Sequence, residues 1–469
     1  MTRGAPGGLA DRVVVLDVVG LGPEHVDASR TPALADLLGD VASLRPPFPA
    51  VTVPSQTTLA TGLSPAAHGD VANGVYDRAS DEVTFWGRER GDRDRLWETA
   101  RDAGATTGAL FFQHLLGTTA DVAVTPKPVE DEHNDLIEMN CWCNPEGFYD
   151  DLRADLGHFP LHNFWGPMAG EAGSEWILAA AERAVERVDP DLLWTYVPHL
   201  DYAGLAEGPS SDAFDEALST VDRLVGGFLD ALRGDDRWSE TAVVVVSEYG
   251  FHDVQRPVFP NRALRDAGLL AVTDDGEGGE EVDLAASRAF ALVDHQVAHV
   301  HCDPDAVDAA TRALVDLPGV DRALTDDDRV DAGPDHPNAG EVVLVAERDA
   351  WFQYYWWHDR ADAPDYATDV DIHAKPGFDP CELFLGEEGM ASLDPSKVGG
   401  SHGRVDPEVA GTFGVGGPAA PASGFDRDAS APPDGGWDVD ARRVAPTVAA
   451  LLGLDDAVLP GAPEPLPRA

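Results

Sequence analysis

Short, uninterrupted runs of apolar residues alternate along the first half of the chain with longer segments whose apolar residues recur every three or four positions. The first pattern is typical of strands buried on both faces, and the second of helices packed on one face. The alternation predicts an α/β fold with a mainly parallel sheet flanked by helices. The predicted strands are residues 12–19, 104–112, 191–197 and 241–247, and the predicted helices are residues 31–38, 96–103, 176–188 and 212–233.

The middle of the chain has a different pattern, with isolated strands, turns and aromatic residues, and it predicts a smaller α+β lobe inserted into the first domain. The aromatic run at residues 351–357 is expected in the lobe core, with a wall over the substrate as the alternative. Beyond the lobe, Gly-rich loops and a last helix at 445–452 complete the core, and the termini are expected to be loose. The expected parts are a core of residues 10–265 and 396–455, a lobe of residues 266–395, and termini of residues 1–9 and 456–469.

The net charge of the chain excludes some classes of binding partner. The chain has 84 acidic and 33 basic residues, for a formal charge of −51, so its overall field repels nucleic acid and anionic membrane. Abundant Asp with few Lys indicates a protein kept soluble in strong salt, as in halophiles. A polar start and the lack of a long apolar run lead us to expect a cytoplasmic protein. Cys141 and Cys143 have the wrong spacing for a zinc knuckle, so free thiols are expected.

Acidic residues follow three of the buried runs. Asp17 lies at the end of the first, Asp201 shortly after residue 197, and Glu248 directly after residue 247. Ligands of open α/β sheets bind beyond the carboxyl ends of the strands, where these side chains would converge. Converging carboxylates repel one another unless a cation neutralises them, which predicts one or two divalent metals. Ordinary loop or cap residues are the alternative.

A hydroxyl group is predicted at the N-terminus of a helix near these acids. Thr52 occupies an expected N-cap position, with Pro54 in the first turn. Free backbone N–H groups and the positive end of the helix favour a phosphoryl group there. A plain helix cap is the alternative, but metal coordination would turn the Thr52 hydroxyl into a nucleophile.

Residues 48–74, FPAVTVPSQTTLATGLSPAAHGDVANG, resemble the nucleophile segment of the type I phosphodiesterase/nucleotide pyrophosphatase family of the alkaline phosphatase superfamily. The segments around Asp201, Glu248 and His402 resemble the family's later metal motifs in the same order, so the resemblance spans roughly residues 12–455. It implies an alkaline-phosphatase-like core that hydrolyses a phosphoric ester or diphosphate of a small molecule. The reaction would pass through a Thr52 nucleophile and a phospho-threonine intermediate.

The resemblance also implies the ligands of one or two divalent ions, whether Zn, Mn or Mg. Asp17, Thr52 and Glu248 would surround one ion, while Asp201 and His402 would hold the other. Asn73 would donate its amide to a phosphoryl oxygen.

The sequence departs from the family at its nitrogen ligands. Tyr249 and Leu205 stand where the family has His, and Glu248 stands where it has Asp. Each metal site loses a nitrogen, which favours Mn²⁺ or Mg²⁺ over Zn²⁺. These losses keep open a second hypothesis, a non-catalytic binding or scaffold protein on the same fold. A sulfatase is disfavoured, because its chemistry needs Cys or Ser at position 52 and Arg at position 56, where this chain has Thr52 and Gln56.

Further histidines are open candidates for replacement ligands. Three of them share parity within a predicted strand at residues 289–301, which places them on one face. That face either holds a metal or is an ordinary strand face of the lobe. The histidines considered are His295, His299 and His301 on that strand, His373 in the lobe, His252 near Glu248, and His68, which the resemblance assigns to loop support.

Overall fold

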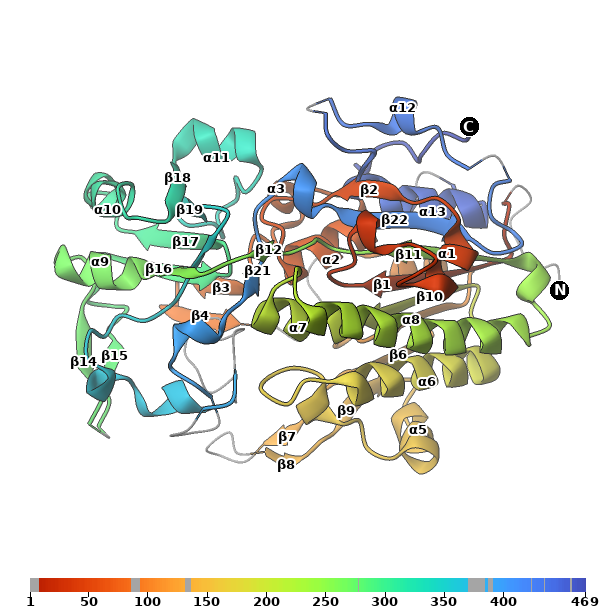
Figure 1. Cartoon of the computed structure of the whole chain (residues 1–469), viewed down its shortest axis with the longest axis horizontal. Coiled ribbons are helices and arrows are strands. Elements are labelled where there is room, and N and C mark those ends of the chain that lie inside the picture. The colour runs from red at the N-terminus through yellow and green to blue at the C-terminus, as the bar shows by residue number, and fades with distance from the viewer. Residues whose placement is uncertain are drawn as a thin grey trace.

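Runs of β-branched residues form the centre of the molecule, because such side chains fill both faces of a buried strand. The structure is a computed structural model in which all seven residues of β1 (Arg12–Val18) and all six of β11 (Thr241–Val246) are buried. It describes residues 8–85, 93–130, 136–276, 278–369, 384–386, 391–422, 424–433, 435–455 and 458–469. Figure 1 shows a larger body around these strands and a smaller one beside it.

The central sheet has nine strands, and two of them, β22 and β9, run against the other seven. The prediction of a mainly parallel sheet is therefore confirmed. In sheet order the strands are β23 (Val439–Asp440), β2 (Ala42–Arg45), β22 (Gly411–Gly416), β11, β1, β10 (Leu192–Val197), β5 (Thr107–Leu110), β6 (Val122–Pro126) and β9 (Cys141–Asn144).

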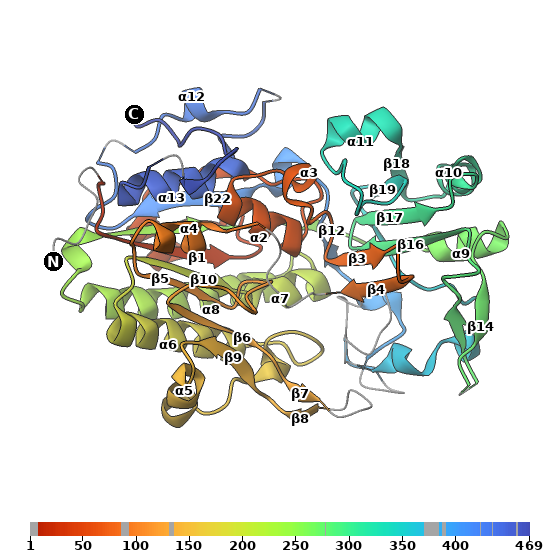
Figure 2. The ribbon, with the colours of Figure 1, turned by 180° about the vertical axis from the view of Figure 1, so that it is seen from behind.

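Helices cover both faces of this sheet, as the views from the front and from behind show (Figures 1 and 2). One layer contains α1 (Pro32–Leu38), α6 (Glu171–Val188), α7 (His199–Glu207) and α8 (Asp212–Arg233). The other contains α2 (Thr52–Thr61), α4 (Leu96–Asp102) and α13 (Val444–Leu452). The three-layer arrangement confirms the predicted fold class. Two short helices, α3 (Pro65–His68) and α12 (Arg427–Ser430), and α5 (Phe148–Leu156) lie in the connections.

A second hydrophobic core belongs to the smaller body, hereafter the lobe. Its four-stranded antiparallel sheet carries helices α9, α10 and α11, and its core includes Phe352 and residues 354–357 of the aromatic run, as predicted. The lobe elements are β16 (Ala289–Asp294), β17 (Val297–Cys302), β19 (Val342–Ala346), β18 (Val320–Leu324), α9 (Pro260–Asp266), α10 (Val307–Leu314) and α11 (Asp326–Ala332).

Pairs of short strands complete the described structure. They are β3 (Gly74–Asp77) with β4 (Glu82–Phe85), β7 (Val129–Glu130) with β8 (Leu136–Glu138), β12 (His252–Asp253) with β21 (Gly400–Ser401), β13 (Arg256–Val258) with β20 (Ala350–Phe352), and β14 (Val272–Asp274) with β15 (Glu280–Val282). No helix of the described residues is long and apolar enough to cross a membrane.

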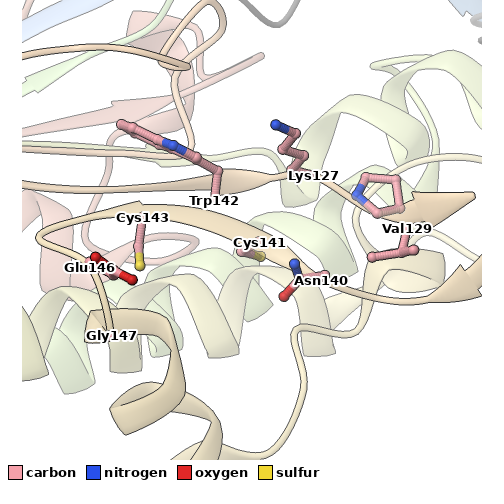
Figure 3. Close-up of a pocket in the computed structure, with 9 residues that line it drawn as sticks. Lys127, Val129, Asn140, Cys141, Trp142, Cys143, Glu146 and Gly147 are labelled. Atoms are coloured by element: carbon pink, nitrogen blue, oxygen red, sulfur yellow. The ribbon is translucent and has the colours of Figure 1, made fainter.

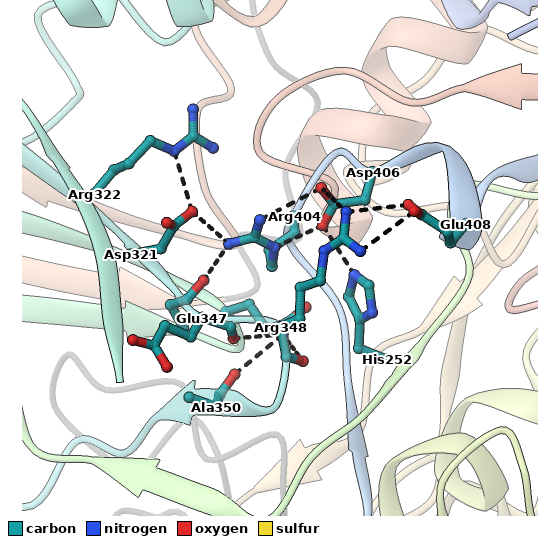
Figure 4. Close-up of polar contacts among 11 residues, drawn as sticks. His252, Asp321, Arg322, Glu347, Arg348, Ala350, Arg404, Asp406 and Glu408 are labelled. Atoms are coloured by element: carbon teal, nitrogen blue, oxygen red, sulfur yellow. Dashed lines mark hydrogen bonds and ion pairs between the residues drawn. The ribbon is translucent and has the colours of Figure 1, made fainter. Parts of the chain in front are cut away.

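An ion-pair cluster joins the lobe to the core (Figure 4). The Arg404 guanidinium, 8% exposed, pairs with Asp321 of β18 at 2.9 Å and with Asp406 at 2.7 Å, and it also donates to the Ala346 carbonyl. The Asp406 carboxylate contacts His252 at 3.1 Å. A buried cation that loses its partners destabilises a fold strongly. Arg404 has one partner in the lobe and another in the segment that carries His402, so its ion pairs hold the lobe against that segment.

Two predictions about local structure are wrong. The strand expected at residues 289–301 is a hairpin, and His295 lies in its turn with a φ of 57°, so it does not share a face with His299 and His301. The C-terminal residues 458–469 are not loose: Leu459 and Leu466 are buried, and the Leu466 N–H donates to Thr447 Oγ1 at 3.0 Å. Burial of these two leucines holds this segment, although its Pro-rich sequence predicts no helix or strand.

Candidate active site

The carboxyl ends of three adjacent parallel strands bring the predicted acids to one edge of the sheet. Asp17 of β1 is in register with Tyr196 of β10 on one side and with Val246 of β11 on the other. Glu248 lies two residues beyond the end of β11, and Asp201 lies in the first turn of α7, after β10. The three acids therefore lie at the carboxyl ends of adjacent strands, where the sequence pattern predicts them.

Asp17 and Glu248 form a buried carboxyl pair. Neither Asp17 oxygen, nor Glu248 Oε2, receives a hydrogen bond from a donor of the described residues, and the two side chains are 0% and 1% exposed. Burial raises the pKa of Asp17 to about 8, opposed by its contact with Glu248. Burial, and then the charge of Asp17, raise the pKa of Glu248 well above its usual range. Without a cation, such a pair holds a proton at neutral pH.

Asp201 adds a third negative charge. Its carboxylate raises the pKa values of Glu248 and of the buried phenol of Tyr196, in both cases after the larger effect of burial. The three acids Asp17, Glu248 and Asp201 are hereafter the carboxylate side of the site.

The nucleophile candidate lies at the N-terminus of α2. Thr52 is the first helical residue rather than the predicted N-cap, because the Ser55 N–H donates to the Val51 carbonyl and makes Val51 the cap. The Thr52 side chain is 5% exposed, and its Oγ1 lies 2.9 Å from the Tyr249 hydroxyl. Tyr249 thus contacts the Thr52 hydroxyl directly, from the position where the resemblance implies a metal-binding His.

Asn73 reaches the same helix terminus. Its Oδ1 accepts a 2.9 Å hydrogen bond from the Val53 N–H, and its Nδ2 donates to Asp294 of the lobe at 2.9 Å. The sequence placed Asn73 at the site, and the structure brings it to the residue that follows Thr52.

The imidazole of His402 lies in an aromatic stack. His402 and Tyr249 stack face to face with ring centroids 3.8 Å apart, and His295 packs against His402 at 3.9 Å. His402 Nδ1 donates to the Ala50 carbonyl at 2.9 Å, which leaves the lone pair on Nε2. Burial, then the charge of His295, lower the pKa of His402 well below its usual value. His402, Tyr249 and His295 are hereafter the imidazole side.

Comparison with known proteins identifies the family of this chain. The family model of type I phosphodiesterase/nucleotide pyrophosphatase matches residues 13–379. The chain belongs to this family. An uncharacterized pyrophosphatase/phosphodiesterase of Schizosaccharomyces pombe is 23% identical over 262 residues, which are 54% of this chain and 46% of that protein. The chain spans less than half the length of the curated relatives it matches.

Solved structures share the fold of this family member. An inactive variant of murine ectonucleotide pyrophosphatase/phosphodiesterase 5 in complex with AMP has a TM-score of 0.58 and 17% identity, with 95% of each chain covered. Phosphonoacetate hydrolase from Sinorhizobium meliloti in complex with phosphonoformate has a TM-score of 0.56 and 18% identity, with 87% of this chain and 90% of that chain covered. Both are similar in an alkaline-phosphatase-like α/β core.

The family is typically dependent on divalent metal, and the two sides of this site differ in how they suit one. No group of three or more His, Cys, Asp and Glu side chains in the described ranges is arranged to hold an ion. The buried Asp17 and Glu248 oxygens that lack a donor nevertheless suit a hard cation, for which the Thr52 hydroxyl would supply a third oxygen. On the imidazole side, Leu205 is an apolar core residue, so the His402 Nε2 lacks the partner nitrogen of the family.

Other predicted histidines have structural roles in this family member. His252 pairs with Asp406, and His68 Nε2 lies 3.0 Å from Thr58 Oγ1, so His68 supports α2 as the resemblance implied. His299 Nδ1 accepts from the Gly340 N–H, and its Nε2 contacts the Val71 carbonyl at 3.1 Å. His373 lies outside the described residues.

Two residues of the site were not predicted from the sequence. Gln56 Nε2 donates to Glu248 Oε1 at 2.8 Å, while Gln56 Oε1 accepts from the Gln113 N–H at 2.7 Å. Asp294 holds Asn73 from the lobe. Gln56 lies one helical turn after Thr52, a spacing that could have indicated it, whereas no local signal connects Asp294 to residue 73.

A separate pocket of about 470 Å³ lies at the edge of the central sheet beside β9, four strands from β1 (Figure 3). Lys127, Trp142, Cys143 and Glu146 are among its lining residues, and it includes none of the predicted site residues. Cys141, Cys143 and Cys302 are free thiols, and Cys381 lies outside the described residues.

Proposed function

We propose that this protein is a metal-dependent hydrolase of phosphoric esters or diphosphates that uses Thr52 as its nucleophile. The observation that carries the proposal is the position of the Thr52 hydroxyl, which is buried at a helix N-terminus, within 2.9 Å of Tyr249 and next to the residue that Asn73 holds. Membership in the family supports hydrolysis of this class. The AMP and phosphonoformate held by solved relatives support a small phosphorylated substrate.

The chain's own residues would share the work as follows. Tyr249 orients the Thr52 hydroxyl, and its buried phenol stays protonated because burial raises its pKa well above 10. The Asn73 side chain, which Asp294 holds in place, would contact a phosphoryl oxygen of the substrate. Asp17, Glu248 and Thr52 would hold a divalent ion, which lowers the pKa of a coordinated hydroxyl and neutralises phosphoryl charge when bound.

Attack by Oγ1 of Thr52 forms a bond to phosphorus and breaks the bond to the leaving oxygen, which departs with the proton that the hydroxyl loses. A water molecule then cleaves the phospho-threonine and restores the hydroxyl. Exclusion of water by the buried walls of the site would favour transfer to the hydroxyl in the first step.

The test is a panel of substrates assayed with Mg²⁺, Mn²⁺ or Zn²⁺: p-nitrophenyl phosphate, bis-p-nitrophenyl phosphate and a dinucleoside diphosphate. We expect turnover of at least one of them, and mass spectrometry of acid-quenched enzyme should locate a phosphoryl group on Thr52. Absence of turnover across the panel, together with failure to bind any of the three ions at millimolar concentration, would favour a scaffold protein instead.

A further inference from the structure

We propose that Asp294, at the tip of the β16–β17 hairpin of the lobe, is a positioning residue for the Thr52 site. It holds Asn73 and, through Asn73, the N-terminal turn of α2. The inference rests on the proposed function, because it assigns a role in setting the geometry of that same site.

The contact between Asp294 and Asn73 is bidentate and buried. Asp294 Oδ2 accepts from the Asn73 backbone N–H at 2.8 Å, and Oδ1 accepts from Asn73 Nδ2 at 2.9 Å. The two residues are 2% and 3% exposed, so water competes little for these hydrogen bonds. Hydrogen bonds to an ionised acceptor are stronger than neutral ones, and two of them fix both the backbone and the side chain of one residue.

The carboxylate also decides the orientation of the Asn73 amide. With Nδ2 facing Asp294, Oδ1 faces α2 and accepts the Val53 N–H at 2.9 Å. A flipped amide would place its oxygen against the carboxylate and its NH₂ group against the Val53 N–H, which opposes acceptor to acceptor and donor to donor. Asp294 therefore keeps Asn73 in the orientation that tethers the residue next to Thr52.

The hairpin tip is itself held on the core side and on the lobe side. The Gln296 N–H donates to the His402 carbonyl at 2.8 Å, and Gln296 Nε2 donates to the Ala350 carbonyl at 3.1 Å. The His295 carbonyl accepts from the Phe352 N–H at 2.8 Å. The tip is thus a fixed support, and the lobe contributes to the geometry of the reacting hydroxyl from 221 residues away in the sequence.

The experiment compares kcat and KM of Asp294→Ala, Asn73→Ala and the double variant on the best substrate of the panel. A misplaced nucleophile lowers the rate of the chemical step, so we expect Asp294→Ala to reduce kcat about 10- to 100-fold and to raise KM by a smaller factor. Because Asp294 acts through Asn73, the double variant should be no slower than Asn73→Ala. Independent, multiplying losses would overturn the proposal, as would wild-type kcat in Asp294→Ala.

A matched control separates positioning from loosening of the loop. His299→Ala removes another buried contact between the lobe and the same loop, at Val71, without touching Asn73. It should lower the melting temperature at least as much as Asp294→Ala, while kcat stays within about threefold of wild type. If His299→Ala lost as much kcat as Asp294→Ala, the role of Asp294 would be structural and the positioning proposal would be wrong.

Failure of the proposed function has a different signature. If Thr52→Ala retains full turnover, the site assignment is wrong whatever Asp294 does. Loss of turnover in Thr52→Ala, with Asp294→Ala at wild-type rate, removes the positioning role alone. Calorimetric titration with inorganic phosphate gives a readout without turnover: Asp294→Ala and Asn73→Ala should weaken binding by similar factors, and His299→Ala should not. Unchanged phosphate affinity in Asp294→Ala would count against the proposal.

Discussion

The carboxylate side and the imidazole side of the site are adjacent, yet they differ in whether burial leaves them in need of a positive charge. Asp17 and Glu248 are buried with oxygens that have no donor among the described residues, and this arrangement is costly until a proton or a cation joins them. His402 and Tyr249 form a neutral stack, with burial holding the His402 pKa low. One side therefore requires a positive charge, and the other is stable without one. The comparison leads us to expect that the carboxylate side binds a metal ion more tightly than the imidazole side.

The most severe test removes the hydroxyl that both sides adjoin. Thr52→Ala should reduce turnover by about 1,000-fold or more, because no other group supplies the attacking oxygen. Steady-state assays and metal content measure the outcome, and metal content should fall only modestly, because the two charged ligands Asp17 and Glu248 remain. Thr52→Ser, which keeps the hydroxyl, is the control and should retain measurable turnover. Wild-type hydrolysis by Thr52→Ala would contradict the nucleophile assignment.

Metal stoichiometry tests the comparison directly. After chelation and refilling with Mn²⁺, we expect about one tightly held ion per chain, because Leu205 leaves the imidazole side short of a ligand. Asp17→Asn should weaken that ion about 100-fold, since it removes a charged oxygen ligand. His402→Ala should leave it in place. Elemental analysis and Mn²⁺ titration are the measurements, and two equally tight ions per chain would show that both sides bind metal.

Loss of the hydrogen bond between Tyr249 of the imidazole side and Thr52 should have a smaller effect. Tyr249→Phe removes the 2.9 Å contact with Thr52 Oγ1 and preserves the ring that stacks on His402. A lost hydrogen bond of this kind is worth about 1 kcal/mol, so kcat should fall roughly 5- to 10-fold. Substrate affinity should hold, because the phenol contacts the nucleophile. A kcat equal to that of wild type would show that the Thr52 hydroxyl is oriented by other groups.

The smallest expected effect is a slope in stability with pH for the metal-free protein, and its sign differs between the sides. The pKa of Asp17 is raised to about 8, so its contribution to stability is present at low pH and is lost as pH rises toward 8. The pKa of His295 is lowered to about 3 by burial, so its contribution is present above about pH 6.5 and is lost as pH falls.

Thermal unfolding in chelator between pH 5 and 8 measures both slopes. Asp17→Asn should gain stability relative to wild type as pH rises, and His295→Gln should gain relative to wild type as pH falls. Each slope is at most about 1.4 kcal/mol per pH unit. Parallel curves for wild type and both variants would contradict the assigned protonation states.

Much of the core was predictable because local patterns specify it. The apolar runs that predicted strands at 191–197 and 241–247 became β10 (Leu192–Val197) and β11, and the alternation at 212–233 became α8. Boundaries were less certain: α6 begins at Glu171, five residues before the predicted start. The strands β2, β22, β6 and β9 were not predicted, because Gly-rich or short segments such as Gly411–Gly416 have little β signal of their own.

The sequence by itself determined which chemical groups this protein has: acids after three strands, Thr52 before Pro54, and Tyr249 and Leu205 in place of nitrogen ligands. The strands that carry these acids and the nucleophile motif follow from neighbouring residues, whose spacing sets their geometry. Only the tertiary structure decided that Tyr249 stacks on His402 and contacts Thr52, and that Asp294 of the lobe holds Asn73. Those contacts join residues about 150 to 220 positions apart, and packing of whole elements, which leaves no local trace, brings them together.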